Sequence, residues 1–181
     1  MIIFLMYAII TVYLGTGILY FASKRPDYSH IRQTISELGE DGAVNAVKVN
    51  FGLFLPVSIV LITIALAGDG VGFGKPLSLC IGIGYLLSAL FPCDPGSPLW
   101  GSRKQSVHNL AGVIEYGGGI YFLYQGKAFF PGGGQMLGTL FLLLMISLIL
   151  LASPPEFKWR GLFQRIVEII LYGLLLWINY P

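Results

Sequence analysis

The sequence predicts an all-α polytopic membrane protein, a bundle of six transmembrane helices with a short interfacial helix on its cytoplasmic side. Three observations support this fold class. Of the 181 residues, 55% are hydrophobic and only 11% are charged, whereas soluble domains carry about 25% charged residues. The mean hydropathy of the chain is +0.76. The apolar residues form runs of about 17–25 residues, the length at which a helix crosses a bilayer.

Six such runs make residues 1–181 a single integral membrane domain. Pro26 follows the first run and stops it, since a helix usually ends before a proline. Pro56 lies inside the second run, where membrane helices tolerate a kink, and Pro76 opens the third run, where it suits the first helical turn. The predicted spans are residues 2–22, 49–67, 76–92, 106–125, 135–152 and 162–180.

The positive charges predict how the bundle is oriented. Nine of the 11 Lys and Arg residues lie in the first, third and fifth connections, and only Lys75 and Lys127 lie in the other two. The positive-inside rule therefore places those three connections in the cytoplasm and both termini outside the cytoplasmic membrane. No positive residue precedes the first run, so we expect an uncleaved anchor and not a signal peptide.

The first connection contains the predicted interfacial helix, over residues 28–39. Ile31, Ile35 and Leu38 recur at the i, i+4, i+7 spacing of one helix face. Asp27 suits the N-cap of this helix, and Gly39 suits its end. We expect the helix to lie along the inner membrane surface or to tuck under the bundle. A helix that only joins two spans is the plainer interpretation.

Glycines in three of the runs predict where helices approach closely, because small residues typify contacts between membrane helices. The three consecutive glycines of the fourth run allow a second interpretation, a flexible break in the helix. The residues concerned are Gly15, Gly17, Gly82, Gly84, Gly117, Gly118 and Gly119.

Two ionisable groups in the predicted spans need an explanation. Glu115 follows His108 by seven residues, so both side chains project from one helix face. An ionised carboxylate inside the hydrocarbon is costly, so Glu115 is expected to be protonated, paired or turned toward a wet cavity. A helix–helix hydrogen bond from a neutral Glu115 is the alternative. Arg165 and Glu168, three residues apart, are expected to compensate each other near the interface.

Other polar residues of the cytoplasmic side suggest a catalytic arrangement. His108 is the candidate general base, Glu37 or Asp94 the carboxylate that orients it, and Cys93 or Ser36 the nucleophile. The plainer interpretation is that Asp94 caps a turn and Cys93 only packs. Whether these groups share one pocket does not follow from their spacing.

We expect no metal and no other cofactor. Two histidines cannot supply a three-histidine zinc site, although His30 and His108 with Asp94 or Glu37 would make a mixed one. The remaining cysteine, Cys80, lies about 20 Å along a helix from its counterpart in the third connection, too far for a disulfide. A net charge of +2, with its cations in separate loops, predicts no nucleic-acid partner.

Three short motifs resemble those of a known family. They are residues 35–39 (ISELG) after the first run, Phe91-Pro92 with Asp94 after the third, and His108-Asn109 at the start of the fourth. In order and spacing they resemble a family of small prokaryotic membrane proteins catalogued as domain of unknown function nine-nine-eight. The resemblance covers nearly the whole chain and implies a six-helix bundle in the cytoplasmic membrane. It implies no reaction, substrate or catalytic residue.

These observations lead to three functional hypotheses. The first is a non-catalytic accessory subunit that binds lipid or other membrane subunits. It follows from the small size and the scarcity of residues outside the spans. The alternative is an enzyme acting on a lipid or amphiphile at the cytoplasmic leaflet. The weaker alternative is a proton- or ion-coupled carrier that uses Glu115.

Overall fold

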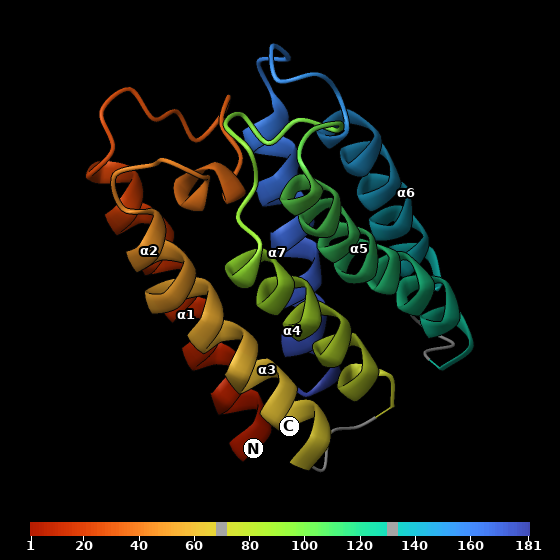
Figure 1. Cartoon of the computed structure of the whole chain (residues 1–181). Helices are drawn as coiled ribbons and strands as arrows, with labels where there is room; N and C mark the ends of the chain where they lie inside the picture. Colours follow the sequence, from red (N-terminus) through yellow and green to blue (C-terminus); the bar gives the residue numbers. More distant parts are fainter. Residues whose placement is uncertain (68–71, 130–133) are drawn as a thin grey trace.

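The computed structural model describes residues 1–67, 72–129 and 134–181, and this part of the chain contains helices and no strands. The long helices run beside one another and form a bundle (Figure 1). The helices are α1 (Ile2–Ser23), α2 (Ala46–Val49), α3 (Leu55–Ala67), α4 (Gly74–Leu90), α5 (Arg103–Phe129), α6 (Gly134–Leu151) and α7 (Arg160–Ile178), with two short turns, η1 (Ser36–Gly39) and η2 (Asn50–Phe54).

Helical structure covers each of the six predicted runs, with ends that differ by a few residues. Four segments are long and apolar enough to cross a membrane, namely α1, the continuous segment α2–η2–α3, α6 and α7. Helix α4 is apolar but has only 17 residues. Helix α5 is the longest, with 27 residues, and carries several polar ones. The chain thus has the composition of a helical membrane protein.

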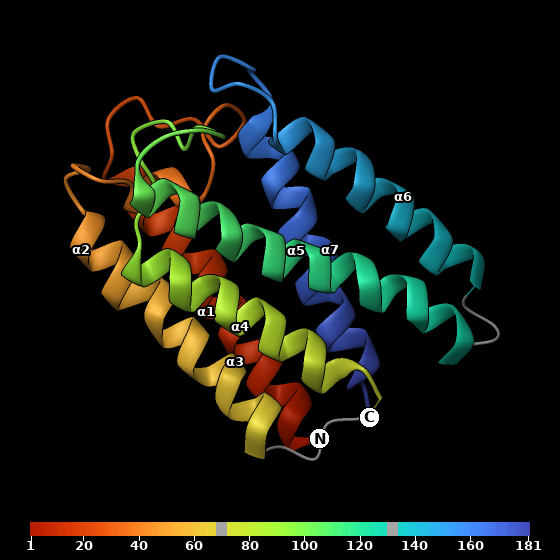
Figure 2. The ribbon, with the colours of Figure 1, turned by 45° about the vertical axis from the view of Figure 1, so that its right-hand side comes forward.

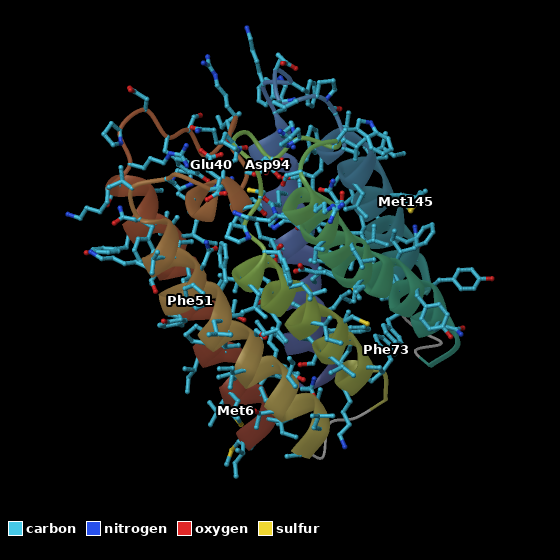
Figure 3. All side chains as sticks on the ribbon, viewed as in Figure 1. Met6, Glu40, Phe51, Phe73, Asp94 and Met145 are labelled. Atoms are coloured by element: carbon cyan, nitrogen blue, oxygen red, sulfur yellow. The ribbon has the colours of Figure 1, made fainter. Side chains whose placement is uncertain are left out.

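The two chain termini lie together at one end of the bundle (Figures 1 and 2). The connections 24–45, 91–102 and 152–159 lie at the opposite end, which we call the loop end. Glu40 and Asp94 mark the loop end, whereas Phe51 and Met145 lie along the helices (Figure 3). Large apolar side chains such as Ile9 are exposed on the outside of the helices, as expected for a surface that faces lipid.

Pro56 shows how the bundle accommodates an irregular helix. It follows the π-helical turn η2, and it has no N–H to donate to the carbonyl of Gly52 one turn earlier. The hydroxyl of Tyr13, on α1, donates to that carbonyl instead. A neighbouring helix therefore supplies the hydrogen bond that the proline removes.

The interfacial helix predicted over residues 28–39 is wrong for most of its length. Only Ser36–Gly39 is helical, as the single 3-10 turn η1. Asp27, the predicted N-cap, has a φ of 62°, a left-handed backbone that differs from the β-region conformation of an N-cap.

Local hydrogen bonds explain this difference, because the N–H of Thr34, which a helix over residues 28–39 would pair with the carbonyl of His30, is bound by a side chain instead. The side-chain oxygen of Gln33 accepts from the N–H of Ser29 at 2.9 Å, and a carboxylate oxygen of Glu37 accepts from the N–H of Thr34 at 2.9 Å. Ile35 is buried in the core. The segment therefore tucks under the bundle, which is one of the two expected placements.

Several of the predicted glycine contacts are present. A Cβ added to Gly82 of α4 would lie 2.8 Å from the Ile62 side chain of α3, and one added to Gly118 of α5 would lie 2.6 Å from Cys80 of α4. Helix α5 continues through residues 117–119, so the interpretation as a flexible break is wrong. Gly15, in contrast, faces open space.

Candidate functional site

A cavity of about 390 Å³ lies at the loop end of the bundle, between α4, α5, α6 and α7. This volume falls within the range of small-molecule sites. Part of its wall is apolar and part is polar. Apolar wall residues include Phe54, Val113, Ile120, Leu148 and Leu151, and polar ones include Ser36, Tyr85, His108, Glu115, Tyr116, Arg160, Gln164 and Glu168.

The cavity reaches the outer surface beside α5 and α6. Val113, on α5, lines the cavity and is 67% exposed. Gly117, one helical turn further along α5, also lines the cavity and is exposed. Leu148 and Leu151 of α6 form the facing wall and are half-buried. An apolar opening on the flank of a membrane bundle gives access to hydrocarbon chains.

A chain of hydrogen bonds orders the polar part of the wall. The backbone N–H of Ile35 donates to Gln164 Oε1 at 2.5 Å, and Gln164 Nε2 donates to the Tyr116 hydroxyl at 3.0 Å. Tyr116 in turn donates to Glu168 Oε1 at 3.2 Å, and Tyr85 donates to Glu168 Oε2 at 3.0 Å. Both oxygens of Glu168 therefore act as acceptors, which suits an ionised carboxylate.

Glu115 lies against Glu168 in the same wall. The Glu115 side chain interacts with the Glu168 carboxyl group. Glu115 is only 5% exposed, and its Oε1 atom has no hydrogen-bond partner among the described residues. Two buried carboxyl groups in contact repel each other when both are ionised. The pair therefore holds one proton between its members unless a cation lies beside it.

His108 lies on the same cavity wall as Glu115. Its Nδ1 is 3.1 Å from the carbonyl oxygen of Phe91. A carbonyl can only accept, so Nδ1–H is the donor and Nε2 remains as an acceptor in the neutral ring. The group that orients the imidazole is thus a backbone carbonyl rather than one of the predicted carboxylates.

Arg160, at the start of α7, closes the loop end of the cavity. It is 5% exposed, and its guanidinium donates to the carbonyls of Leu151 (3.2 Å), Gly96 (2.8 Å) and Ser97 (2.6 Å). These bonds join the last turn of α6, the 91–102 connection and α7.

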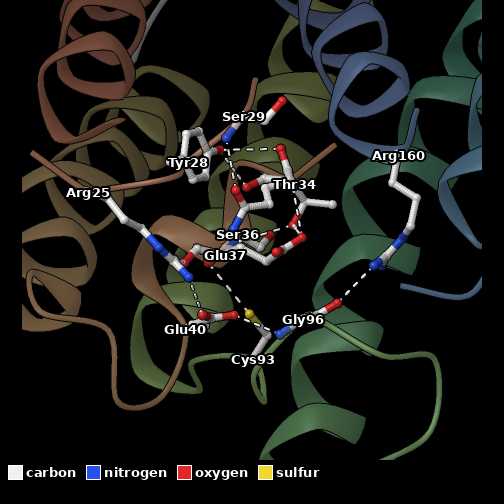
Figure 4. Close-up of polar contacts among 11 residues, drawn as sticks. Arg25, Tyr28, Ser29, Thr34, Ser36, Glu37, Glu40, Cys93, Gly96 and Arg160 are labelled. Carbon is white, nitrogen blue, oxygen red and sulfur yellow. Dashed lines mark hydrogen bonds and ion pairs between the residues drawn. The ribbon is translucent and has the colours of Figure 1, made fainter. Parts of the chain in front are cut away.

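The connections above the cavity form a cap, which we define as residues 25–40 and 93–99. Glu40 links its two parts, because one carboxylate oxygen pairs with Arg25 at 2.6 Å and the other accepts from the N–H of Gly96 at 2.7 Å (Figure 4). Lys104 and Asp41 form a second ion pair beside it, at 2.6 Å.

The structure brings together only part of the predicted catalytic arrangement. Ser36 and His108 both line the cavity, whereas Glu37, Cys93 and Asp94 do not. The carboxylate of Glu37 accepts from the N–H and the hydroxyl of Thr34, at 2.9 and 3.0 Å. That carboxylate is therefore engaged within the cap.

Cys93 and Asp94 stabilise the cap. Cys93 is fully buried, its thiol donates to the carbonyl of Ser36 at 3.5 Å, and burial raises the pKa of the thiol to about 12. Asp94 accepts from the N–H and the hydroxyl of Ser102, both at 2.7 Å. These hydrogen bonds lower the pKa of the Asp94 carboxyl below its usual value.

Arg165 and Glu168 do not form an ion pair within 4.0 Å, although the charge of Arg165 still acts on Glu168. The guanidinium of Arg165 donates to the Tyr28 hydroxyl at 2.9 Å and lies 3.0 Å from His30 Nδ1, while Glu168 turns to Tyr85. Burial, and then Arg165, lower the pKa of His30. Within residues 1–67, 72–129 and 134–181, no three His, Cys, Asp or Glu side chains are grouped to hold a metal ion.

Sequence reasoning missed the tyrosines, the glutamine and the arginine of this site. The sequence did contain a pattern that predicts part of this polar wall. Gln164, Glu168 and Tyr172 are spaced four residues apart and therefore share one face of α7. Tyr85 offers no such signal, because its hydrogen bond to Glu168 joins residues 83 positions apart.

The resemblance proposed from the sequence motifs is confirmed by comparison with known families. A family model described as "Protein of unknown function (DUF998)" matches residues 6–179, a range that includes every residue of the cavity wall named above. No curated protein and no solved structure matches the chain. The chain belongs to the DUF998 family.

Proposed function

We propose that this protein crosses the cytoplasmic membrane six times and binds a lipid or similar amphiphile, as a non-catalytic subunit. The observation that carries the proposal is the cavity itself, which combines an apolar wall, an opening beside α5 and α6, and a buried polar cluster. An amphiphile has the same division into a chain and a polar group. A ligand of this kind can enter sideways from the bilayer.

The six crossings are supported by the arrangement of the helices. Helices α4 and α5 pack between apolar segments that are each long enough to span a bilayer (Figures 1 and 2). The termini share one end, as an even number of crossings requires. The loop end carries most of the Lys and Arg residues, and the positive-inside rule then favours its location in the cytoplasm.

Binding is favoured over catalysis by the arrangement around His108. The imidazole of His108 is hydrogen-bonded to the carbonyl of Phe91, and the hydroxyl of Ser36 accepts a hydrogen bond from Gln164 at 3.4 Å. A nucleophile, base and orienting acid in mutual hydrogen-bond reach is the usual mark of nucleophilic catalysis. Such a set is not assembled among the described residues.

The test is to identify what the protein retains from the membrane. The full chain is purified in a mild detergent and analysed by native mass spectrometry and lipid extraction. We expect one bound amphiphile per chain in the wild type and a marked loss in Gly117→Leu. Gly117 lines the cavity, and an added Cβ there meets nothing within 4 Å, so the larger side chain extends into the opening without a clash at its base.

Gly15→Leu is the matched control. Gly15 also lies in an apolar helix and faces open space, but it is on α1 and does not line the cavity. Retention of the amphiphile by both variants, or its absence from the wild type, would refute the proposal. Orientation is tested separately with tags on both termini, which we expect to be accessible from outside intact cells.

A further inference from the structure

Among the described residues, no Lys, Arg or His nitrogen lies within 4.0 Å of a carboxylate oxygen of Glu115 or Glu168, the acidic pair of the cavity. Within the part of the chain that the structure describes, the ion pairs closer than 4.0 Å are Arg25–Glu40 and Lys104–Asp41. Arg165, on the same helix as Glu168, is engaged by the cap. A buried carboxylate without a counter-ion is costly, and a cation beside it lowers that cost.

One oxygen of this pair lacks a hydrogen-bond partner. Oε1 of Glu115 is buried and unpaired among the described residues, and it belongs to a residue of the cavity wall. The oxygens of Glu168, in contrast, are occupied by Tyr85 and Tyr116. Glu115 Oε1 is therefore an acceptor of the pair that the described residues leave unused.

The surrounding rings suit the same kind of group. Phe54, Tyr85 and Tyr116 line the cavity, and the rings of Phe54 and Tyr85 lie 5.6 Å apart in an edge-on arrangement. Aromatic rings stabilise organic cations such as substituted ammonium groups. The acidic pair would repel an anionic group. A neutral group would leave the negative charge of the pair without compensation.

From these contacts we infer that the amphiphile carries an ammonium group, and that Glu115 and Glu168 hold this group. The inference rests on the proposed function, because the cavity must first accept an amphiphile. When the ammonium group binds, its positive charge compensates the single negative charge of the pair, and the two carboxyl groups keep the proton that they share. Glu115 Oε1 then accepts a hydrogen bond from the ammonium N–H or, for a quaternary group, lies in contact with its methyl groups.

The experiment compares three ligands with the same chain and different head groups. Dodecylamine is cationic near pH 7, dodecanol is neutral and dodecanoate is anionic. Each is added below its micellar concentration to the full chain in a neutral maltoside detergent, and the thermal unfolding midpoint and the affinity are measured. We expect dodecylamine to raise the midpoint most. We expect Glu115→Gln and Glu168→Gln each to weaken dodecylamine binding about tenfold or more, since a charged hydrogen bond or ion pair is lost.

Two further variants keep the test independent of folding. Glu156→Gln removes a carboxylate from an exposed position of the 152–159 connection and leaves dodecylamine binding unchanged. Tyr85→Phe keeps the ring and removes the hydroxyl that donates to Glu168, so it weakens binding without abolishing it.

The outcomes separate this inference from the proposed function. If the three dodecyl compounds bind equally and Glu115→Gln changes nothing, the ammonium inference is overturned while amphiphile binding stands. If none of them binds, the proposed function falls as well. If ethylammonium or sodium ions stabilise the wild type as strongly as dodecylamine does, the acidic pair is a site for small cations and the inference is overturned.

Discussion

Gly84 of α4 is in direct contact with Glu115 of α5. A Cβ added to Gly84 would lie 2.6 Å from both the Cβ and the Oε2 of Glu115, far closer than van der Waals contact allows. The missing side chain of Gly84 therefore makes the space in which α5 places its buried carboxyl group. The position of one acidic residue depends on the smallest residue of the neighbouring helix.

Gly84→Ala is expected to displace the Glu115 side chain and to lower stability. Overpacking of a tight contact costs about 1–3 kcal/mol, so we expect a lower thermal midpoint together with weaker dodecylamine binding. Gly15→Ala is the control, because Gly15 faces open space in another apolar helix. Equal behaviour of the two variants would show that the Gly84–Glu115 contact is not tight in the protein.

Gln164→Leu is expected to destabilise the loop end of the bundle. Gln164 accepts from the N–H of Ile35 and donates to the hydroxyl of Tyr116, and the variant leaves both groups without this partner in a buried place. The expected loss is about 1–3 kcal/mol, measured by thermal or denaturant unfolding in detergent.

The chain contains a matched control for this variant. Gln125 also donates to a tyrosine hydroxyl at 3.0 Å, that of Tyr121, but this hydrogen bond is exposed. Gln125→Leu is therefore expected to change stability by less than about 0.5 kcal/mol. If the two variants lost similar amounts of stability, the hydrogen bonds of Gln164 would not owe their importance to burial.

The helices of this fold were predictable because each is marked by a long apolar run, which depends only on residues close in sequence. The shared wall position of His108 and Glu115 also follows from spacing within one helix. The cap was not predictable in the same way. Ile35 has the spacing of a helix face, but the N–H of Thr34, which a continuous helix would pair with the carbonyl of His30, donates to the carboxylate of Glu37.

Arg165 and Glu168 show a second limit of sequence reasoning. They are three positions apart, which permits an ion pair on one helix. Each side chain instead finds a partner from a distant segment, the Tyr28 hydroxyl for Arg165 and the Tyr85 hydroxyl for Glu168. Spacing along a helix shows which residues can meet, whereas tertiary packing decides which of them do.

Cys93 is expected to resist alkylation in the folded protein. Its side chain is fully buried and the pKa of its thiol is raised to about 12, so at about pH 8 roughly one molecule in ten thousand carries the reactive thiolate. The measurement uses a maleimide and a Cys80→Ala background. We expect slow labelling of the folded chain and fast labelling after denaturation. Rapid labelling without denaturant would show that the cap opens freely.

The same thiol is expected to make stability depend on pH in the alkaline range. The unfolded chain loses the proton above about pH 8.5, whereas the folded chain keeps it up to about pH 12. Stability therefore falls by about 1.4 kcal/mol per pH unit in this window from Cys93 alone. Cys93→Ser removes this titration and retains a hydroxyl donor. Its thermal unfolding midpoint should therefore fall less than that of the wild type between about pH 7.5 and pH 9.5. Parallel decreases in the two proteins would contradict the prediction.

Arg160→Lys is expected to loosen the cap although it preserves the charge. The guanidinium reaches three carbonyls at once, those of Leu151, Gly96 and Ser97, and an ammonium group lacks the fork geometry for this. Ser97 has a φ of 46°, a left-handed conformation that is unfavourable for a residue other than glycine. Its carbonyl bond to Arg160 helps to hold that conformation.

Hydrogen exchange measures this effect directly. In the wild type the N–H of Gly96 is bonded to Glu40 and that of Ser97 to the carbonyl of Asp94, both within hydrogen-bond distance. We expect both amides to exchange faster in Arg160→Lys, while the amides in the middle of α4 keep their protection. Arg103→Lys, at an exposed position at the start of α5, leaves all of them unchanged. If exchange at Gly96 and Ser97 stayed slow in Arg160→Lys, the turn would be held by Glu40 and Asp94 alone, and the closure of the cavity would not depend on α7.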